Sequence, residues 1–118
     1  MIQYEGGLII SNNKYEITDI SHEEYPFLHR IRALRDVGAE VKAGDLGGFV
    51  ESESNLSTVP GDNAWIYEDA IAAGDAYVDQ NATLQGKAVA CDQAYISQNA
   101  LLAGNSRAED MAYICGGV

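Results

Sequence analysis

The sequence predicts an all-β protein whose C-terminal part is a parallel β-helix, preceded by a segment of ordinary β-strands. Three observations support this prediction. A small residue returns at every sixth position, an apolar residue follows it two places later, and the type of that apolar residue repeats at every eighteenth position. An α-helical face would need a period near 3.6 residues, which this part of the chain lacks.

The six-residue period consists of two series. The small residues are Ala64, Ala70, Ala76, Ala82, Ala88, Ala94, Ala100, Ser106, Ala112 and Val118. The apolar residues two places later are Ile66, Ala72, Val78, Leu84, Ala90, Ile96, Leu102, Ala108 and Ile114. Together they give the in–out–in alternation of a very short strand, and the mostly polar or glycine residues that follow suit a bend.

A longer period is contained in the second series. Its every third member has the same character, so that Ile66, Leu84 and Leu102 are large whereas Ala72 and its successors are always alanine. Three six-residue units therefore make one turn of 18 residues, and successive turns stack as parallel strands about 4.8 Å apart. Small residues occupy the corners because the chain turns inward there, and the alanine face lets the two bulkier faces fill the interior.

The pattern divides one compact domain into three parts. Residues 1–43 do not repeat; within them "KYEIT" and "FLHRIRALRDV" alternate like strands, joined by the connector "SHEEYP". This N-terminal strand segment is expected to pack on the coil. Residues 44–60 form an irregular first coil, because Val50 and Leu56 lie six positions apart and each has a small residue two places earlier. Regular units fill residues 61–118.

Charge is the unusual feature of the composition. The 118 residues include 18 acidic and 7 basic ones, which gives a net charge of −11. Such a surface repels nucleic acid and anionic membranes and attracts basic protein surfaces, although solubility alone would also explain it. The chain shows no membrane-spanning run and no signal-peptide pattern, so we expect a cytoplasmic protein. Cys91 and Cys115 lack metal-ligand spacing, so we expect neither a metal nor a cofactor.

The stretch "HRIRALRDVGAEVKAGDLGGFVESESNLS", followed by six-residue units, resembles a family of small bacterial and prophage proteins. These are left-handed parallel β-helix proteins with hexapeptide repeats, often labelled hexapeptide transferases. The resemblance covers about residues 28–118 and implies a left-handed coil, whose hand the periodicity itself does not give. Family members usually carry further hexads, so this chain is short. If the chain is encoded by a phage, it would work in the cytoplasm of the host cell.

The resemblance raises the question of catalysis. Acyltransferases built on this fold use a histidine on the coil as general base and hold acyl-CoA between the subunits of a trimer. Here His22 and His29 both lie outside the regular units, and Lys87 and Arg107 are the only basic residues in 61–118. We therefore expect no catalytic residue, and a hexapeptide-repeat acyltransferase remains the alternative. Four further basic residues are expected to pair with nearby acids such as Asp36, Glu40 and Asp45: these are Arg30, Arg32, Arg35 and Lys42.

Two outward columns are candidate binding surfaces. One is an aromatic ladder of Tyr77, Tyr95 and Tyr113, which could bind a partner or merely stabilise the coil by stacking. The other is an acidic ridge, in which Asp75, Asp92 and Glu109–Asp110 should line up along the axis and further acids lie nearby. The predicted partner-binding acids are Glu68, Asp69, Asp75, Asp79, Asp92, Glu109 and Asp110.

A row of negative charges can imitate a nucleic-acid backbone, whose charges repeat about every 3.4 Å along each strand. The sequence thus predicts a non-catalytic acidic interaction protein that blocks a nucleic-acid-binding host protein. The prophage resemblance suggests an anti-CRISPR protein or another inhibitor of host defence, with no direct contact to nucleic acid or membrane.

A structural, self-assembling β-helix is the further alternative. The apolar end "MAYICGGV" predicts self-association, most simply as a two-fold homodimer. The residues expected to mediate it are Met111, Tyr113, Ile114 and Val118.

Overall fold

The computed structural model describes residues 3–5, 8–10 and 12–116, with side chains from residue 12 onward. Its described part is all-β apart from one 3₁₀ turn, η1 (Glu53–Asn55), which confirms the predicted class. The N-terminal strands are β1 (Gln3–Glu5), β2 (Leu8–Ile10), β3 (Tyr15–Ser21), β4 (His29–Ala33) and β5 (Leu46–Val50). The C-terminal strands are β6 (Trp65–Ile66), β7 (Ile71–Ala72), β8 (Tyr77–Val78), β9 (Thr83–Leu84), β10 (Val89–Ala90), β11 (Tyr95–Ser97), β12 (Leu101–Leu102), β13 (Arg107–Ala108) and β14 (Tyr113–Cys115).

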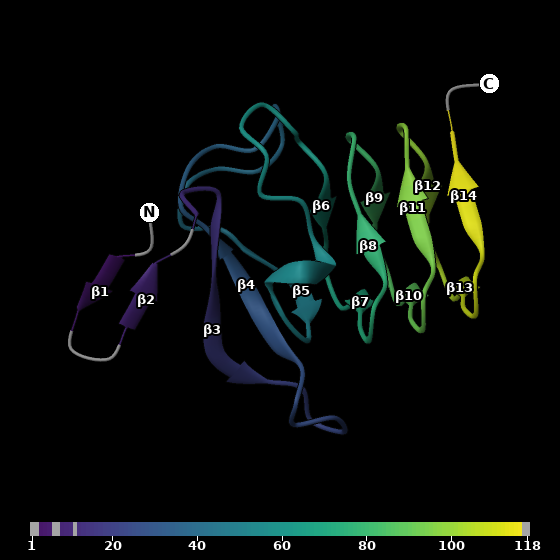
Figure 1. The fold of residues 1–118 in the computed structure, drawn as a ribbon, viewed down its shortest axis with the longest axis horizontal. Coiled ribbons are helices and arrows are strands. Elements are labelled where there is room, and N and C mark those ends of the chain that lie inside the picture. The colour runs from purple at the N-terminus through teal and green to yellow at the C-terminus, as the bar shows by residue number, and fades with distance from the viewer. Residues whose placement is uncertain (1–2, 6–7, 11, 117–118) are drawn as a thin grey trace.

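The C-terminal strands form a parallel β-solenoid of about 4 turns. Its three faces are the sheets β5-β7-β10-β13, β8-β11-β14 and β6-β9-β12. Within each face, the strands of successive turns lie side by side along the longest axis of the molecule (Figure 1). The inward columns are in direct register: Ile66 pairs with Leu84, and Leu84 pairs with Leu102. The alanine column (Ala72, Ala90, Ala108) and the β-branched column (Val78, Ile96, Ile114) pair in the same way.

The corners of the solenoid combine a buried small residue with a backbone in the left-handed region. The corner alanines from Ala64 to Ala100 are at most 4% exposed, whereas Ser106 is exposed and donates its hydroxyl to the carbonyl of Ala103. Glycine tolerates positive φ at no steric cost, but other side chains do not. The non-glycine residues with positive φ are Glu68, Gln80, Asn81, Asp92, Gln98, Asn99 and Asp110, and all of them lie at corners.

The N-terminal strands extend one face of the solenoid and cover its first turn. β3, β4 and β5 pair antiparallel, and β5 then pairs parallel with β7, so that six strands form one sheet. Tyr15, Ile31 and Val37 belong to the same buried cluster as Trp65. The backbone approaches closely at Gly48, where an added Cβ would lie 2.5 Å from both the Ala70 carbonyl oxygen and the Ile66 side chain.

A buried polar residue joins the irregular segment after β5 to the next turn. The side-chain oxygen of Asn55 accepts from the backbone N–H groups of Glu51 and Ser52, and its amide nitrogen donates to the carbonyls of Gly74 and Ala76. These four bonds satisfy the buried amide completely. Two further side chains reach the same segment: Lys14 donates to the carbonyl of Ser57, and the Tyr15 hydroxyl to that of Leu56.

The outward apolar residues of the coil differ in how far they are covered. Trp65 is 1% exposed because Tyr15 meets it edge-on at 6.3 Å, and Ile71 is buried with Leu28 and Phe49. Val89 is half-buried and Leu101 is 58% exposed. The described part of the chain contains no helix long and apolar enough to cross a membrane.

Candidate binding surfaces

The structure distributes the predicted acidic residues over three corners of the solenoid. Asp75, Asp92 and Glu109–Asp110 lie at one corner, in the bends before β8, β11 and β14. We call this the acidic corner. Glu68 and Asp69 lie at the bend between β6 and β7, and Asp79 follows β8. The separation arises because consecutive six-residue units supply consecutive corners, so acids six positions apart fall on different edges.

Several of these carboxylates bind backbone N–H groups of a neighbouring turn. Glu68 accepts from Gly86 N–H at 2.6 Å, and Asp92 accepts from Asp110 N–H at 2.9 Å. Glu51 does the same for Gly74 at 2.7 Å. In each case the donor residue has positive φ and its N–H lies at a bend between the short strands. A carboxylate in this position accepts a hydrogen bond from a backbone N–H that would otherwise be bonded only to water.

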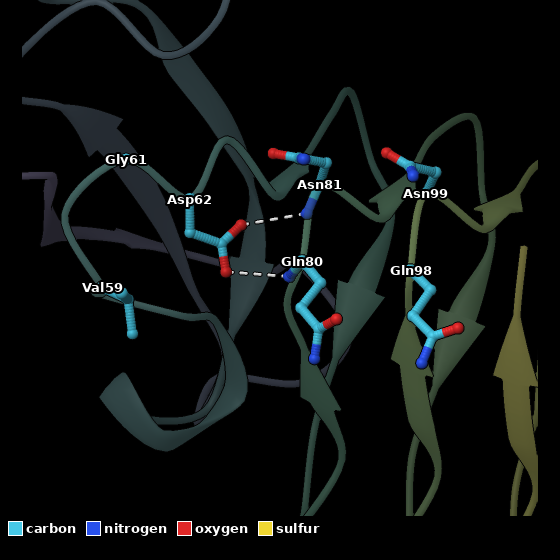
Figure 2. Close-up of a pocket in the computed structure, with 7 residues that line it drawn as sticks. All are labelled: Val59, Gly61, Asp62, Gln80, Asn81, Gln98 and Asn99. Carbon is cyan, nitrogen blue, oxygen red and sulfur yellow. Dashed lines mark hydrogen bonds between the residues drawn. The ribbon is translucent and has the colours of Figure 1, made fainter. Parts of the chain in front are cut away.

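Asp62 repeats this arrangement at the third corner, where Gln80, Asn81, Gln98 and Asn99 form two tiers of amides (Figure 2). Its carboxylate accepts from the N–H groups of Gln80 at 2.8 Å and Asn81 at 3.0 Å. Partial burial acts to raise the pKa of Asp62, but the N–H groups of Asn81, Ala64 and Gln80 together hold it below the ordinary value. These amides border a hollow of about 540 Å³, and of its side chains those of Asp62 and Asn81 accept backbone N–H groups.

Charge pairing further reduces the set of free carboxylates. Asp69 binds Arg30 at 2.7 Å, Glu109 binds Arg107 at 2.7 Å, and Asp79 accepts from the hydroxyls of Tyr95 and Ser97. Among the described residues, the carboxylates of Asp75 and Asp110 accept no hydrogen bond and form no ion pair. The part of the acidic corner available to a partner is therefore centred on these two exposed side chains.

The three tyrosines form a stacked column. The ring centroids of Tyr77 and Tyr95 are 5.9 Å apart, those of Tyr95 and Tyr113 are 5.1 Å apart, and both pairs are inclined by only 13°. The rings therefore cover one another's faces and present their edges outward. Only the terminal ring, Tyr113, is largely exposed, at 56%. This geometry accounts for the ladder as a stabilising stack along the coil.

The residues predicted to mediate self-association lie at the C-terminal turn. Met111 is 78% exposed, Tyr113 is exposed, and Ile114 is half-buried against the core. Val118 lies outside the described residues. The strands of this turn, β12, β13 and β14, each pair on one side only within the described part of the chain.

The basic residues of the N-terminal half are engaged, though not always with the expected partners. Arg30 pairs with Asp69 and Arg32 with Glu16, while Lys42 lies 3.8 Å from Asp36. Arg35 donates to the backbone carbonyl of Asp36. The long-range pairs depend on strands that meet only in the folded sheet, which sequence proximity cannot indicate.

The two histidines lie in the β3–β4 connector and at the start of β4. His22 accepts the N–H of Glu24 at its Nδ1 and packs against Phe49 and Tyr25, while His29 is a half-buried residue of β4. His22 does, however, line a groove between the β3–β4 connector and the outer face of β5, β7 and β10. The repeat pattern gives no indication of this groove, because the groove depends on how the connector folds onto the sheet. The cluster of aromatic residues in 22–27 is the available signal in the sequence.

One cluster has the composition of a metal site. Ligand atoms of Cys91, Asp92 and Glu109 lie within 4.8 Å of one another. The guanidinium of Arg107 contacts two of them, at 3.3 Å from the Cys91 sulfur and 2.7 Å from a Glu109 oxygen. The Arg107 guanidinium is thus a cation already bound beside these ligand atoms, and it pairs with one of the two carboxylates, that of Glu109.

Comparison with family models, with curated proteins and with solved structures found no match to this chain. The function must therefore be argued from the surfaces themselves.

Proposed function

We propose that the protein is a non-catalytic acidic binding module that occupies the basic, nucleic-acid-binding surface of another protein and so blocks it. The observation that supports this most directly is the acidic corner. It combines the unbonded carboxylates of Asp75 and Asp110 with those of Asp92 and Glu109 on a rigid edge of a chain with net charge −11.

Electrostatics explains why such an edge would select a basic protein. A surface of one sign raises the encounter rate with a complementary surface and repels surfaces of like sign, including nucleic acid and anionic membranes. Adjacent turns place Asp92 and Asp110, 18 positions apart, about 4.8 Å from each other along the axis, while the phosphates of a nucleic-acid strand repeat about every 3.4 Å. The partner would accept the corner where it normally accepts a phosphate backbone.

The resemblance to prophage proteins narrows this proposal to a class of partner. A phage-encoded protein of this kind would act on a nucleic-acid-binding component of host defence, as anti-CRISPR proteins do, in the host cytoplasm. The same resemblance supports two finer features of the fold, a left-handed coil and a hexapeptide repeat of 18 residues per turn. The pairing of residues 18 positions apart, as between Ile71 and Val89, agrees with that repeat.

We also propose that two copies associate through the C-terminal turn, by Met111, Tyr113, Ile114 and Val118. The exposed face of Tyr113 supports this, because a second ring could continue the tyrosine stack. Light scattering would test it: Ile114→Asp should convert a dimer into a monomer, and an unchanged dimer would refute this interface.

The main proposal can be tested with charge-matched variants. Wild-type protein, Asp75→Asn/Asp110→Asn, and the control Asp19→Asn/Glu40→Gln would be immobilised and exposed to bacterial lysate at low and high salt. Both double variants remove two negative charges from exposed positions, but the control leaves the acidic corner intact.

We expect wild type and control to retain the same nucleic-acid-binding protein at low salt, and excess duplex DNA to displace it. The corner variant should retain much less of it. Equal retention by the corner variant, or retention that DNA does not reduce, would contradict the proposal.

A further inference from the structure

A groove of about 610 Å³ has no residue of the acidic corner's bends in its lining. It is bounded by the β3–β4 connector on one side and by the outer face of the sheet β5-β7-β10 on the other. Its lining includes His22 and Tyr25 from the connector and Phe49, Ile71, Lys87 and Val89 from the sheet side.

The groove has an apolar floor and an aromatic wall. Phe49, Ile71 and Val89 supply the floor, since they are the outward residues of three adjacent paired strands. His22 stands edge-on to Phe49, with ring centroids 4.7 Å apart, and its other neighbour Tyr25 is at 5.1 Å. Tyr25 itself is 47% exposed. The walls are therefore fixed by contacts within the protein. Phe49 and Ile71 are at most 9% exposed, so the apolar surface open to a ligand is mainly that of Val89 and Tyr25.

Arg30 is held in place at one side of this floor. Its guanidinium lies 4.3 Å from the centre of the Phe49 ring and donates to the carbonyls of Gly47 at 2.9 Å and Glu68 at 2.7 Å. A third bond, to Asp69 at 2.7 Å, balances its charge. Arg30 thus shapes the groove without offering an unbalanced positive charge.

Lys87 differs from the other basic residues near the surface. It follows Gly86, whose carbonyl accepts the N–H of Asp69, so it lies one turn beyond that residue on the same side of the groove. Lys87 is exposed, and among the described residues its ammonium group has neither a hydrogen-bond nor an ion-pair partner. Arg32, Lys42 and Arg107 each have a carboxylate partner within 4.0 Å.

We propose that this groove binds a small organic carboxylate with a compact apolar body. The apolar part lies on Ile71 and Val89 beside the aromatic wall, and the carboxylate is paired with Lys87. Glu23 and Glu24 of the connector and Asp69 on the coil side also line the groove. Because Asp69 already pairs with Arg30, Lys87 is the cation left to bind the ligand's carboxylate. This site is independent of the acidic corner, so either proposal can fail without the other.

The test uses three probes of one shape and different charge: phenylacetate, 2-phenylacetamide and phenethylamine. Binding to the full chain would be followed by NMR titration of backbone amides. We expect phenylacetate to bind about fivefold more tightly than the amide, as one partly exposed ion pair would give, with shifts centred on Ile71, Val89 and Tyr25. Phenethylamine should bind most weakly.

Two lysine variants distinguish binding in the groove from non-specific attraction between the anionic probe and any surface lysine. Lys87→Gln should reduce phenylacetate affinity to that of the amide, whereas Lys42→Gln, which removes an equal charge from another exposed position, should leave it unchanged. Both side chains are exposed, so both variants should fold, as circular dichroism would verify. Tightest binding of phenethylamine, an unaltered affinity of Lys87→Gln, or the absence of groove shifts with all three probes would each overturn the proposal.

Discussion

The N-terminal region, residues 12–56, and the regular coil, residues 64–115, are stabilised in different ways. In the first, buried polar side chains such as Lys14 and Asn55 make several specific long-range bonds. The interior of the coil is almost entirely alanine and larger aliphatic side chains in repeated registers, and Ser97 is its one buried polar residue among those described. Single residues should therefore matter greatly in the N-terminal region, while the coil should tolerate the exchange of whole turns.

The largest expected effect is at Asn55. Asn55→Asp keeps the shape of the side chain but replaces the amide that donates to the Gly74 and Ala76 carbonyls with a carboxylate oxygen. Two buried acceptors would then face an acceptor, and we expect unfolding free energy to fall by about 4 kcal/mol. Chemical denaturation would measure this, with the exposed amide variant Asn105→Asp as the control. A loss below 1 kcal/mol would show that the network is not critical.

A smaller but still large effect is expected from Gly48→Ala. The added methyl group would lie within 2.5 Å of a backbone oxygen and the Ile66 side chain, so β5 or β7 must shift, at a cost of about 3 kcal/mol. Gly104→Ala is the comparison within the coil. It has positive φ but no atom within 4 Å of the new Cβ, so it should cost only about 1 kcal/mol. Denaturation midpoints in the opposite order would contradict the close approach at β5.

Lys14 gives the N-terminal region a pH dependence. Burial lowers its pKa to about 8, opposed by Asp62 and assisted by Arg35. The unfolded chain then binds more protons than the folded protein between about pH 8 and 10.5, the ordinary pKa of lysine, so the unfolding free energy rises with pH there. Relative to Lys14→Met, we expect wild type to gain about 2 kcal/mol between pH 7 and pH 9.5. If the unfolding free energies of the two proteins changed with pH in parallel, the lowered pKa of Lys14 would be contradicted.

The smallest effects are expected at the corners of the coil. Asp110 has positive φ and its carboxylate binds nothing among the described residues, so Asp110→Gly should stabilise the protein by up to about 1 kcal/mol. Asp92 has the same backbone conformation, but its carboxylate accepts the Asp110 N–H. Asp92→Gly should therefore change stability little. Thermal unfolding of both variants would show whether the carboxylate bond contributes as described.

The repeat made the coil predictable from sequence. The inward columns, such as Ile66, Leu84 and Leu102, follow from counting because each residue has the same environment as its counterparts. The burial of Trp65 does not follow from the repeat, since its cover comes from Tyr15, fifty positions earlier in the chain. The β1–β2 pairing was not anticipated.

The candidate sites were only partly predictable, because the repeat fixes positions within the coil but not the contacts that each side chain makes. Counting placed Asp75, Asp92 and Asp110 at one corner, but it could not reveal that Asp92 serves a neighbouring backbone N–H while Asp75 remains free. Predicting the groove beside Lys87 would require knowing that the connector residues His22 and Tyr25 fold against Phe49. Contacts between non-repeating and repeating segments have no periodic signal.

The claim that the coil consists of interchangeable turns is tested most directly by deletion. Removing residues 77–94 joins Ala76 to Tyr95 and keeps every column in phase, since Tyr95 pairs with Tyr77 and Gln98–Asn99 take the places of Gln80–Asn81. Removing residues 77–82 would bring Leu84 and Ala90 onto the wrong faces. We predict that the longer deletion retains the circular dichroism spectrum and cooperative unfolding of the intact protein, while the shorter one loses both. Greater stability of the shorter deletion would contradict the account.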